Sequence, residues 1–235
     1  MMKKVAVMQP YFFPYLGYFQ LINAVDTFVF YDDVNFIKGG WINRNNILIN
    51  GKARFITIPC KNVSPNRLIN ETQLALGKHN KRKIIKTLQA VYGGAPFFDQ
   101  VFDICTKVLT KNYSSISQLA IQSILESASY IGIDTEFKIS SEAHANTRGL
   151  ERAERLIEIT KREEGSIYVN SINGRQLYEK EYFSNSGIEL FFLKPQLPTY
   201  PHFNGDAEPG LSMIDVMMFN APDQIQAYLK EYTLQ

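Results

Sequence analysis

The sequence predicts an α/β protein with a central, mostly parallel sheet, and three observations carry this prediction. An apolar run at residues 3–7 is followed by a loop, a helical stretch and a second apolar run at residues 26–31, which is the order of a β-α-β unit. The dipeptide Asn50-Gly51 lies between alternating apolar residues, as in a β-hairpin. Further strand-like runs alternate with helical patterns in the C-terminal half, which favours parallel strands joined by helices.

The composition is that of an ordinary globular protein. Of 235 residues, 45% are hydrophobic and 20% are charged, and we interpret residues 1–235 as a single α/β domain. The 25 Lys and Arg nearly balance the 23 Asp and Glu, which gives no electrostatic argument for nucleic acid as the main partner. No apolar run has the length of a membrane span or of a signal peptide. Two cysteines without metal-ligand spacing favour a reducing compartment, so we expect a cytoplasmic protein.

The first unit resembles a nucleotide-binding β-α-β element in its order of segments. The expected strand at residues 3–7 leads through a loop into a helix expected at residues 19–25. The second strand ends in Asp32-Asp33, and an acid at this position often binds a ribose hydroxyl in nucleotide-binding folds. Because no G-x-G-x-x-G motif accompanies the unit, the acids alone indicate such a site only weakly.

The loop at residues 8–19 is the most informative stretch of the chain. It combines two prolines, which fix the backbone, with a glycine and, before Phe19, five aromatic side chains. In an open α/β sheet this loop lies at the carboxyl end of the strands, where ligands bind. We therefore expect Gln9, Tyr11 and Gly17 to contact a substrate. The alternative is an aromatic turn that only fills the core.

A second loop, at residues 34–46, contains the chain's only Trp together with Asn and Arg side chains. Such loops often recognise ligands because they offer a stacking surface and a fork of hydrogen-bond donors. We expect Arg44 to clamp a phosphate or carboxylate, whereas the alternative is a surface loop with its Trp docked on the core. The substrate-binding candidates of this region are Asp32, Asn35, Lys38, Trp41 and Asn43.

The middle of the chain is predicted to form a hairpin and then a helical insertion. The hairpin spans residues 47–59 around the Asn50-Gly51 turn. Three amphipathic patterns follow between residues 78 and 131, and their apolar stripes are typical of helices packed on a core. The basic run at residues 78–83 lacks interleaved aromatic residues, so we interpret it as a solvated helix face.

The C-terminal half is predicted to contain strands at residues 135–139, 166–170 and 188–193 and a helix at residues 150–162. The turn after the second of these strands is expected to open a helix at Arg175. Free backbone N–H groups at such a helix start favour an anion, although a plain helix cap is the alternative. The candidates for binding the anionic part of a substrate are Asn170, Ser171, Asn173 and Gly174.

Metal and histidine chemistry have little support in the sequence. The three histidines, His79, His144 and His202, lack metal-ligand spacing to each other, to cysteine or to carboxylates, so no metal site is predicted. No G-x-S-x-G motif and no P-loop occurs. A lone loop histidine is more often structural than catalytic, and we assign no role to His144 or His202.

Several motifs together resemble the WbqC-like family over nearly the whole chain. They are Q-P-Y-F-F-P-Y-L-G-Y-F at residues 9–19, D-D-V-N-F at 32–36, W-I-N-R-N at 41–45, Y-V-N at 168–170 and L-S-M-I-D at 211–215. The resemblance implies a link to bacterial surface-polysaccharide gene clusters. It also implies a role in adding amino-acid-type acyl groups to amino sugars.

A second resemblance concerns the start of the first expected helix. The segment Pro14-Tyr15-Leu16-Gly17-Tyr18 is placed like the H-x-G-H signature of adenylyl-transferring α/β enzymes, with Tyr15 and Tyr18 at the histidine positions. A phenol donates a hydrogen bond but carries no positive charge near neutral pH. Nucleotide transfer would then need a cation from Lys38, Arg44 or Arg175. On this basis Tyr15, Tyr18 and Arg44 are the candidate catalytic residues.

The sequence and its resemblances lead to one main functional hypothesis and two alternatives. The main hypothesis is a cytoplasmic transferase or amide-forming ligase of O-antigen-type surface-glycan biosynthesis, which acylates or aminoacylates a nucleotide-linked amino sugar. The alternatives are a nucleotidyltransferase-like enzyme and a non-catalytic nucleotide-sugar-binding or scaffold protein. The expected partners are a small-molecule nucleotide sugar or acyl donor, with ATP as a candidate cosubstrate. No oligomeric state is predicted.

Overall fold

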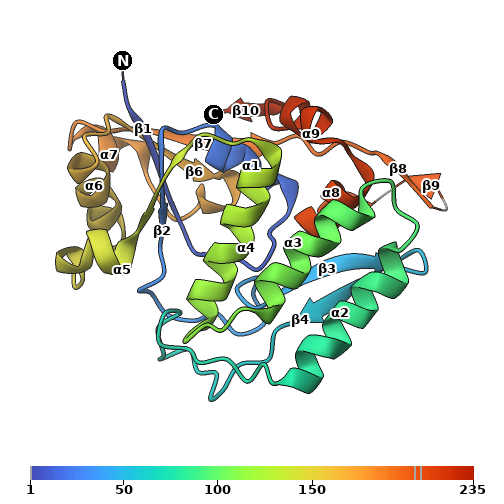
Figure 1. The fold of residues 1–235 in the computed structure, drawn as a ribbon. Helices are drawn as coiled ribbons and strands as arrows, with labels where there is room; N and C mark the ends of the chain where they lie inside the picture. Colours follow the sequence, from blue (N-terminus) through green and yellow to red (C-terminus); the bar gives the residue numbers. More distant parts are fainter. Residues whose placement is uncertain (1, 204, 207) are drawn as a thin grey trace.

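The structure, a computed structural model, describes residues 2–203, 205, 206 and 208–235 and confirms the predicted α/β class (Figure 1). Within these residues the central sheet has six strands in the order β10-β7-β6-β1-β2-β5, and only β10 runs antiparallel to its neighbour. The strands of this sheet are β1 (Lys4–Met8), β2 (Thr27–Phe30), β5 (Glu136–Ile139), β6 (Ile167–Ser171), β7 (Glu189–Pro195) and β10 (Tyr232–Leu234). Two antiparallel pairs lie outside it, β3 (Arg44–Ile49) with β4 (Lys52–Thr57) and β8 (Pro201–His202) with β9 (Gly205–Asp206).

Helices connect the strands and cover both faces of the sheet. The α-helices are α1 (Leu16–Asn23), α2 (Lys78–Tyr92), α3 (Phe98–Thr110), α4 (Ile116–Ile131), α5 (Ser140–Ala143), α6 (Arg152–Arg162), α7 (Lys180–Ser184), α8 (Met213–Phe219) and α9 (Pro222–Tyr228). Two short 3-10 turns, η1 (Ala145–Thr147) and η2 (Ile172–Gly174), complete the connections. None of the helices in the described part of the chain combines the length and apolar character needed to cross a membrane.

The direction of the chain reverses at the centre of the sheet, between β1 and β6. From β1 the chain adds β2 and then β5 on one side, and it later adds β6 and β7 on the other side. The connections on the two sides therefore diverge above the carboxyl ends of β1 and β6. Open α/β sheets bind their ligands in the crevice that forms at such a reversal.

Two apolar cores lie on opposite faces of the sheet, because successive residues of a strand point to opposite sides. Val5 and Val7 of β1 pack with Leu156 of α6 and Phe183 of α7. Ala6, between them, belongs to a larger core with α1, α3 and α4. Figure 1 shows α6 and α7 on one side of β1 and β2 and α1 and α4 on the other.

The hairpin forms as predicted but begins earlier. Asn50 and Gly51 have φ values of 51° and 69°, and positive values at both central residues are typical of the type I′ turn. The first strand of the hairpin starts at Arg44 instead of residue 47. Arg44 and Asn45 are therefore strand residues and not part of the preceding loop, because they pair with Thr57 and Ile56 of β4.

The expected helical insertion is present as α2, α3 and α4. Its core is continuous with that of the sheet, since Leu88, Val108 and Ile124 belong to the same buried cluster as Phe28 and Val169. A shared core of this kind favours the proposal that the chain is one α/β domain.

Gln20 joins the first helix to the C-terminal edge of the sheet. Its side chain is fully buried, and its Nε2 atom lies 2.8–2.9 Å from the backbone carbonyl oxygens of Gln196, Tyr228 and Glu231. Tyr228 and Glu231 lie just before β10 and Gln196 lies just after β7, so one amide group contacts the backbone where the last strand joins β7.

We expect the change Gln20→Leu to lower the free energy of unfolding by about 1–3 kcal/mol, because it removes the donor of three part-buried hydrogen bonds. Urea denaturation followed by circular dichroism measures this change. The matched control is Gln224→Leu at an exposed position of α9, which should change the stability by less than about 0.5 kcal/mol. Equal stability of the two variants would contradict the assigned role of Gln20.

Candidate functional site

Two adjoining cavities lie at the carboxyl ends of β1 and β6, where the direction of the sheet reverses. The larger one, about 670 Å³, we call the charged cavity, and it is lined by residues that include Gln9, Tyr31, Asp33, Asn35, Arg152, Arg155, Asn170, Gly174 and Tyr178. The smaller one, about 450 Å³, we call the neutral cavity, and it is lined by residues that include Pro14, Tyr15, Gly17, Tyr18, Trp41, Asn45 and Leu197.

Four residues line both cavities and form their common wall. Met8 and Tyr11 come from the end of β1 and the loop after it, and Ser171 and Asn173 come from the end of β6. The two loops predicted from the sequence to bind substrate, at residues 8–19 and 170–174, therefore meet in one place. A ligand that lies across this wall would occupy both cavities.

Asp33 is the buried carboxylate of the charged cavity. Its Oδ2 atom accepts hydrogen bonds from Arg155 Nη2 at 2.7 Å and from Arg148 Nε at 2.9 Å. Burial alone would raise the pKa of Asp33, but the two guanidinium groups outweigh burial and hold this pKa below its ordinary value. Asp33 is therefore a permanent anion that fixes Arg155 in the cavity wall.

Two arginines from the first turns of α6 give the charged cavity its positive side. Arg155 is 5% exposed, and its guanidinium carbon lies 4.7 Å from the centre of the Tyr31 ring. Arg152, one turn earlier, is exposed and forms no ion pair with any residue that the structure describes. Because Arg155 is already paired, Arg152 is the cation that remains for an anionic ligand.

Asp32, the other acid after β2, does not line the charged cavity and instead contacts the start of α5. Its carboxylate accepts hydrogen bonds from the backbone N–H and the hydroxyl of Ser141, at 2.9 and 2.8 Å, at the start of α5. Burial raises the pKa of Asp32 above its ordinary value, and the Ser141 hydrogen bonds oppose this rise. The structure therefore places Asp33, and not Asp32, at the charged cavity.

The neutral cavity is built from the aromatic loop and the start of α1. None of its described lining residues is charged. Tyr15 is the residue before α1, and its ring lies over Gly17, where a Cβ atom would come within 2.5 Å of the ring. Gly17 is thus needed to make room for Tyr15 of the same chain.

The tyrosines of the neutral cavity differ in the hydrogen bonds they make. Tyr18 is buried and its hydroxyl donates to the carbonyl oxygen of Gln9 at 2.8 Å, so this group is already used. Tyr11 and Tyr15 donate no hydrogen bond to the described residues. Burial raises the pKa of both Tyr11 and Tyr15, so at neutral pH each presents an O–H donor and not a phenolate.

Distant segments hold the backbone of the aromatic loop in place. The Asn45 side chain donates from Nδ2 to the carbonyl oxygens of Phe12 and Phe13, at 3.2 and 2.8 Å. The Phe13 N–H donates to Ser123 Oγ of α4 at 2.9 Å, and Ser212 Oγ donates to the Phe13 carbonyl at 2.8 Å. Phe13 has a positive φ of 39°, a conformation that needs such support in a bulky residue.

The turn after β6 differs from the expectation in its local structure. Residues Ile172–Gly174 form a single 3-10 turn, and the next helix begins at Lys180 and not at Arg175. A Cβ atom at Gly174 would lie 2.6 Å from Asn170 Nδ2, so the glycine makes room for the Asn170 side chain. Asn170 in turn accepts a hydrogen bond from the Ser171 N–H at 2.8 Å, which holds the turn in shape.

Besides Asp32, three predicted residues line neither cavity. Arg44 donates hydrogen bonds to the carbonyl oxygens of Gly39 and Gly40 and stacks over Phe55, with its guanidinium carbon 4.2 Å from the ring centre. Asn43 donates to the carbonyl oxygen of Ile58, and Lys38 is exposed. Arg44 therefore stabilises the loop that carries Trp41.

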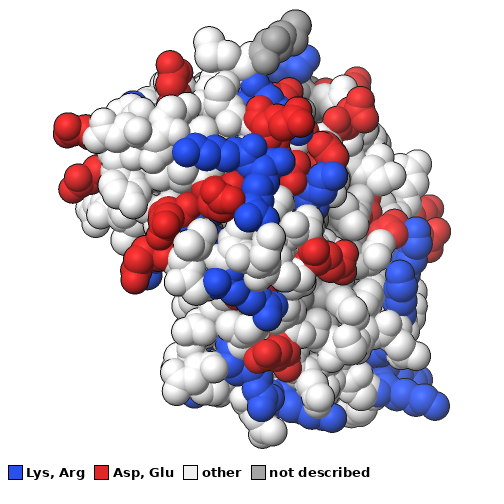
Figure 2. Space-filling view, turned by 90° about the vertical axis from the view of Figure 1, so that its left-hand side faces the viewer, with Lys and Arg blue, Asp and Glu red and all other residues white. Residues whose placement is uncertain are grey.

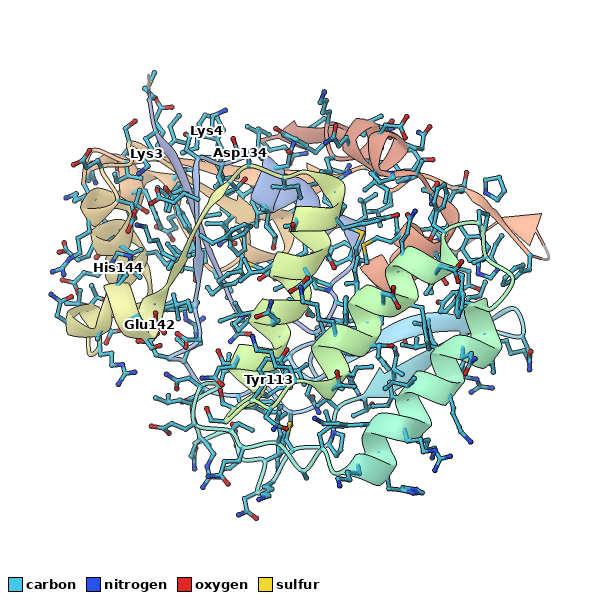
Figure 3. The ribbon with its side chains drawn as sticks, viewed as in Figure 1. Lys3, Lys4, Tyr113, Asp134, Glu142 and His144 are labelled. Carbon is cyan, nitrogen blue, oxygen red and sulfur yellow. The ribbon has the colours of Figure 1, made fainter. Side chains whose placement is uncertain are left out.

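The histidines also lie outside both cavities. Figure 3 labels His144 close to Glu142, at the end of α5, and its Nε2 atom is 3.0 Å from a carboxylate oxygen of Glu163. Burial lowers the pKa of His144 and the Glu163 carboxylate opposes this effect. In the described part of the chain, no group of three or more His, Cys, Asp or Glu residues could hold a metal ion.

Comparison with known proteins places this architecture in a family. The WbqC-like protein family matches residues 9–227, a range that contains nearly every residue of the two cavities. The chain belongs to the WbqC-like protein family. A relative from Mycobacterium tuberculosis (strain ATCC 25618 / H37Rv), named "Uncharacterized protein Rv1507c", is 29% identical over 236 residues, which covers 97% of this chain and 98% of the relative. No solved structure matches the chain.

Several residues that line the charged cavity of this WbqC-like protein were not predicted from the sequence. The residues missed are Tyr31, Arg152, Arg155 and Tyr178, and of the two acids after the second strand the sequence favoured Asp32 over Asp33. One signal was present, because a helix that precedes a parallel strand starts at the carboxyl edge of the sheet. Arg152 and Arg155 are three residues apart at the start of such a helix, so they lie on one helix face at the carboxyl edge of the sheet.

We expect Asp33→Asn to lower the free energy of unfolding at neutral pH by about 3–5 kcal/mol, because it leaves the buried Arg155 without a counterion. The matched variant Arg148→Gln removes the half-exposed partner of the same carboxylate, whose side chain is 46% exposed, and should cost at most about 1 kcal/mol. Urea denaturation measures both changes. A smaller loss for Asp33→Asn than for Arg148→Gln would contradict this assignment.

The pH dependence supplies a second test of Asp33. Its folded-state pKa lies below the unfolded value of about 3.9, so its ionised form stabilises the fold above that pH. This contribution is lost as the pH falls through the folded pKa. The stability difference between the wild-type protein and Asp33→Asn should therefore narrow in acid, and a difference that does not change with pH would contradict the low pKa.

Proposed function

We propose that the protein is a transferase or amide-forming ligase that modifies a nucleotide-linked amino sugar in bacterial surface-glycan assembly. The observation that carries this proposal is the pair of adjoining cavities, one charged and one neutral, at the reversal point of the sheet. A nucleotide sugar has the same division, with a diphosphate in the middle and a neutral ring at its end. The link of the WbqC-like resemblance to surface-polysaccharide genes supports the glycan pathway.

The charged cavity is suited to the nucleotide part of the substrate. Arg152 would pair with the diphosphate, and the N-terminal end of the eleven-residue helix α6 adds its positive dipole from the same side. Asn35 and Gln9 supply amide groups to the same space. Asp33 and Arg155 form a rigid, charge-neutral wall beside the ligand.

The neutral cavity is suited to the sugar or to the acyl group. Tyr11, Tyr15 and Trp41 present aromatic surfaces of the kind that stack on sugar rings, and no charge competes with them. The hydroxyls of Tyr11 and Tyr15 remain protonated at neutral pH and would donate hydrogen bonds to a carbonyl or hydroxyl oxygen of the substrate. Reaction would take place at the common wall, near Ser171 and Asn173.

This arrangement changes the residues proposed for catalysis. The cation that nucleotide transfer would need was expected from Lys38, Arg44 or Arg175, but Arg175 is exposed and its Nη1 atom lies 3.1 Å from Gln235 Oε1. None of the three lines either cavity. We therefore propose Arg152 for charge stabilisation, Tyr15 as a hydrogen-bond donor to the reacting group, and Tyr18 as a positioning residue.

Binding and turnover measurements test the proposal and separate its alternatives. Isothermal titration calorimetry with a nucleoside diphosphate, a nucleotide-linked amino sugar and Mg-ATP identifies the ligand, and mass spectrometry of mixed incubations identifies any product. An acylated amino sugar supports the transferase or ligase, with ATP cleavage marking the ligase. Formation of a nucleotide sugar from a nucleoside triphosphate would replace the proposal with a nucleotidyltransferase. Tight binding without turnover would indicate a binding protein.

We expect Arg152→Gln to raise the dissociation constant of the nucleoside diphosphate about 10- to 150-fold, because it removes a charge-assisted hydrogen bond worth about 1.5–3 kcal/mol. Calorimetry measures this change. The control Lys161→Gln removes an equal charge at the opposite end of α6 and should leave the affinity unchanged. Equal affinities in wild-type protein and Arg152→Gln would remove Arg152 from the site.

We expect Tyr15→Phe and Tyr18→Phe to separate ligand contact from structural support. Tyr15→Phe should keep the stability and reduce turnover of the amino sugar about 5- to 30-fold, as for a lost hydrogen bond of about 1–2 kcal/mol. Tyr18→Phe should lower the free energy of unfolding by about 1–2 kcal/mol, because the part-buried Gln9 carbonyl loses its donor. Thermal denaturation and steady-state kinetics of both variants test the assignment, and unchanged turnover in Tyr15→Phe would refute the role of Tyr15.

A further inference from the structure

Charge is strongly segregated along the chain, although the total is nearly balanced. Residues 34–92, which we call the basic segment, contain eleven Lys and Arg but a single acid, Glu71. The rest of the chain contains fourteen Lys and Arg and twenty-two Asp and Glu. The basic segment comprises the loop before the hairpin, the hairpin β3–β4, the loop after it and α2. One part of the fold is thus strongly cationic.

The positive charge of the basic segment is not neutralised within the fold. None of its eleven basic residues forms an ion pair with a residue in the described ranges. Eight of them are exposed, namely Lys38, Lys52, Arg54, Lys61, Lys78, Arg82, Lys83 and Lys86. Figure 2 shows mainly Lys and Arg along the lower end of the molecule, where Figure 1 places the hairpin, the following loop and α2. Such a field attracts an anionic surface.

Three large apolar side chains of the basic segment are also exposed, and we call them the apolar patch. Ile37, Trp41 and Phe55 are 52%, 42% and 50% exposed. The rings of Trp41 and Phe55 lie 6.0 Å apart, and the Arg44 guanidinium lies over the Phe55 ring. A tight turn joins Ile37 to Trp41, with Gly40 N–H donating to the Ile37 carbonyl. Trp and Phe beside Arg are typical of side chains that enter the interface of a bilayer.

The basic side of α2 has a similar combination of charge and apolar surface. A groove of about 580 Å³ runs along its first half, with Lys78, Arg82 and Lys86 at its rim and Leu76 and Ile85 among its lining residues. No acid occurs anywhere in α2. A cationic rim above apolar carbon matches an anionic headgroup attached to acyl chains.

We propose that the basic segment docks on the surface of a bilayer that contains anionic phospholipids, with the apolar patch inserted into the headgroup region. Nucleic acid fits less well, because α2 presents no exposed Phe, Tyr or Trp for base stacking and Ile37 cannot stack on a base. Trp41 also lines the neutral cavity, so docking would bring the mouth of that cavity to the membrane surface. This inference goes beyond the proposed function and does not depend on it.

The single Trp of the chain makes the inference testable on the intact protein. Full-length protein is mixed with unilamellar vesicles of phosphatidylcholine, with or without about one third phosphatidylglycerol, at low and high salt. We expect sedimentation with the anionic vesicles only, weakened by salt. The emission of Trp41 should shift to the blue and should be quenched by brominated acyl chains, because this side chain enters the interface.

Matched charge reversals identify the surface that binds. The triple variant Arg82→Glu, Lys83→Glu, Lys86→Glu should reduce binding at least about fivefold. The control Lys161→Glu, Lys194→Glu, Lys230→Glu makes the same change in net charge at exposed positions outside the basic segment and should bind like the wild-type protein. Phe55→Ser, at an exposed position, should reduce the blue shift while the fold survives.

Several results would overturn the inference. These are absence of binding to the anionic vesicles, equal loss of binding in both triple variants, and binding without any change in Trp41 emission. Binding of a single-stranded oligonucleotide in place of vesicles would identify a nucleic-acid surface instead. Salt-sensitive self-association without vesicles, measured by analytical ultracentrifugation, would assign the basic segment to a second copy of the chain.

Discussion

The site depends on the buried backbone of the aromatic loop, whose polar groups must find partners away from water. Phe12 and Phe13 are fully buried, and their peptide groups are satisfied by Asn45 of β3, Ser123 of α4 and Ser212 before α8. Three segments that are distant in sequence therefore converge on one turn. This convergence places Tyr11 and Tyr15 at the cavities and explains why the hairpin and the helical insertion pack against the sheet.

Local signals in the sequence predicted the parts of the fold that local physics controls. The Asn50-Gly51 turn, the strand–loop–helix order around residue 9 and the helix stripes between residues 78 and 131 all appear in the structure. The glycine roles were not predictable in the same way. Gly17 and Gly174 make room for Tyr15 and Asn170 of the same chain, and only the packed structure shows which neighbour fills the space.

The candidate site was predictable where it comes from the ends of β1 and β6, and not where it depends on tertiary partners. Asp32 and Asp33 are adjacent in sequence, and their roles separate only because Ser141 donates hydrogen bonds to Asp32 whereas Arg155 pairs with Asp33. Arg44 had the chemistry of an anion clamp, but nearby carbonyls of its own loop engage its guanidinium group. Charge type alone therefore led to the prediction of an anion-binding site, whereas burial and pairing decide which residues line the cavities.

The long connection between β2 and β5 has a consequence for how the chain folds. Residues 27–30 pair directly with residues 136–139, so the hairpin and three helices must be accommodated between two neighbouring strands. Pairing across such a separation raises the contact order, which slows folding because loop-closure entropy is lost before the contacts form. The insertion helices rest on local contacts, whereas the pairing of β2 with β5 needs closure of the whole connection, so we expect this edge of the sheet to form late in folding.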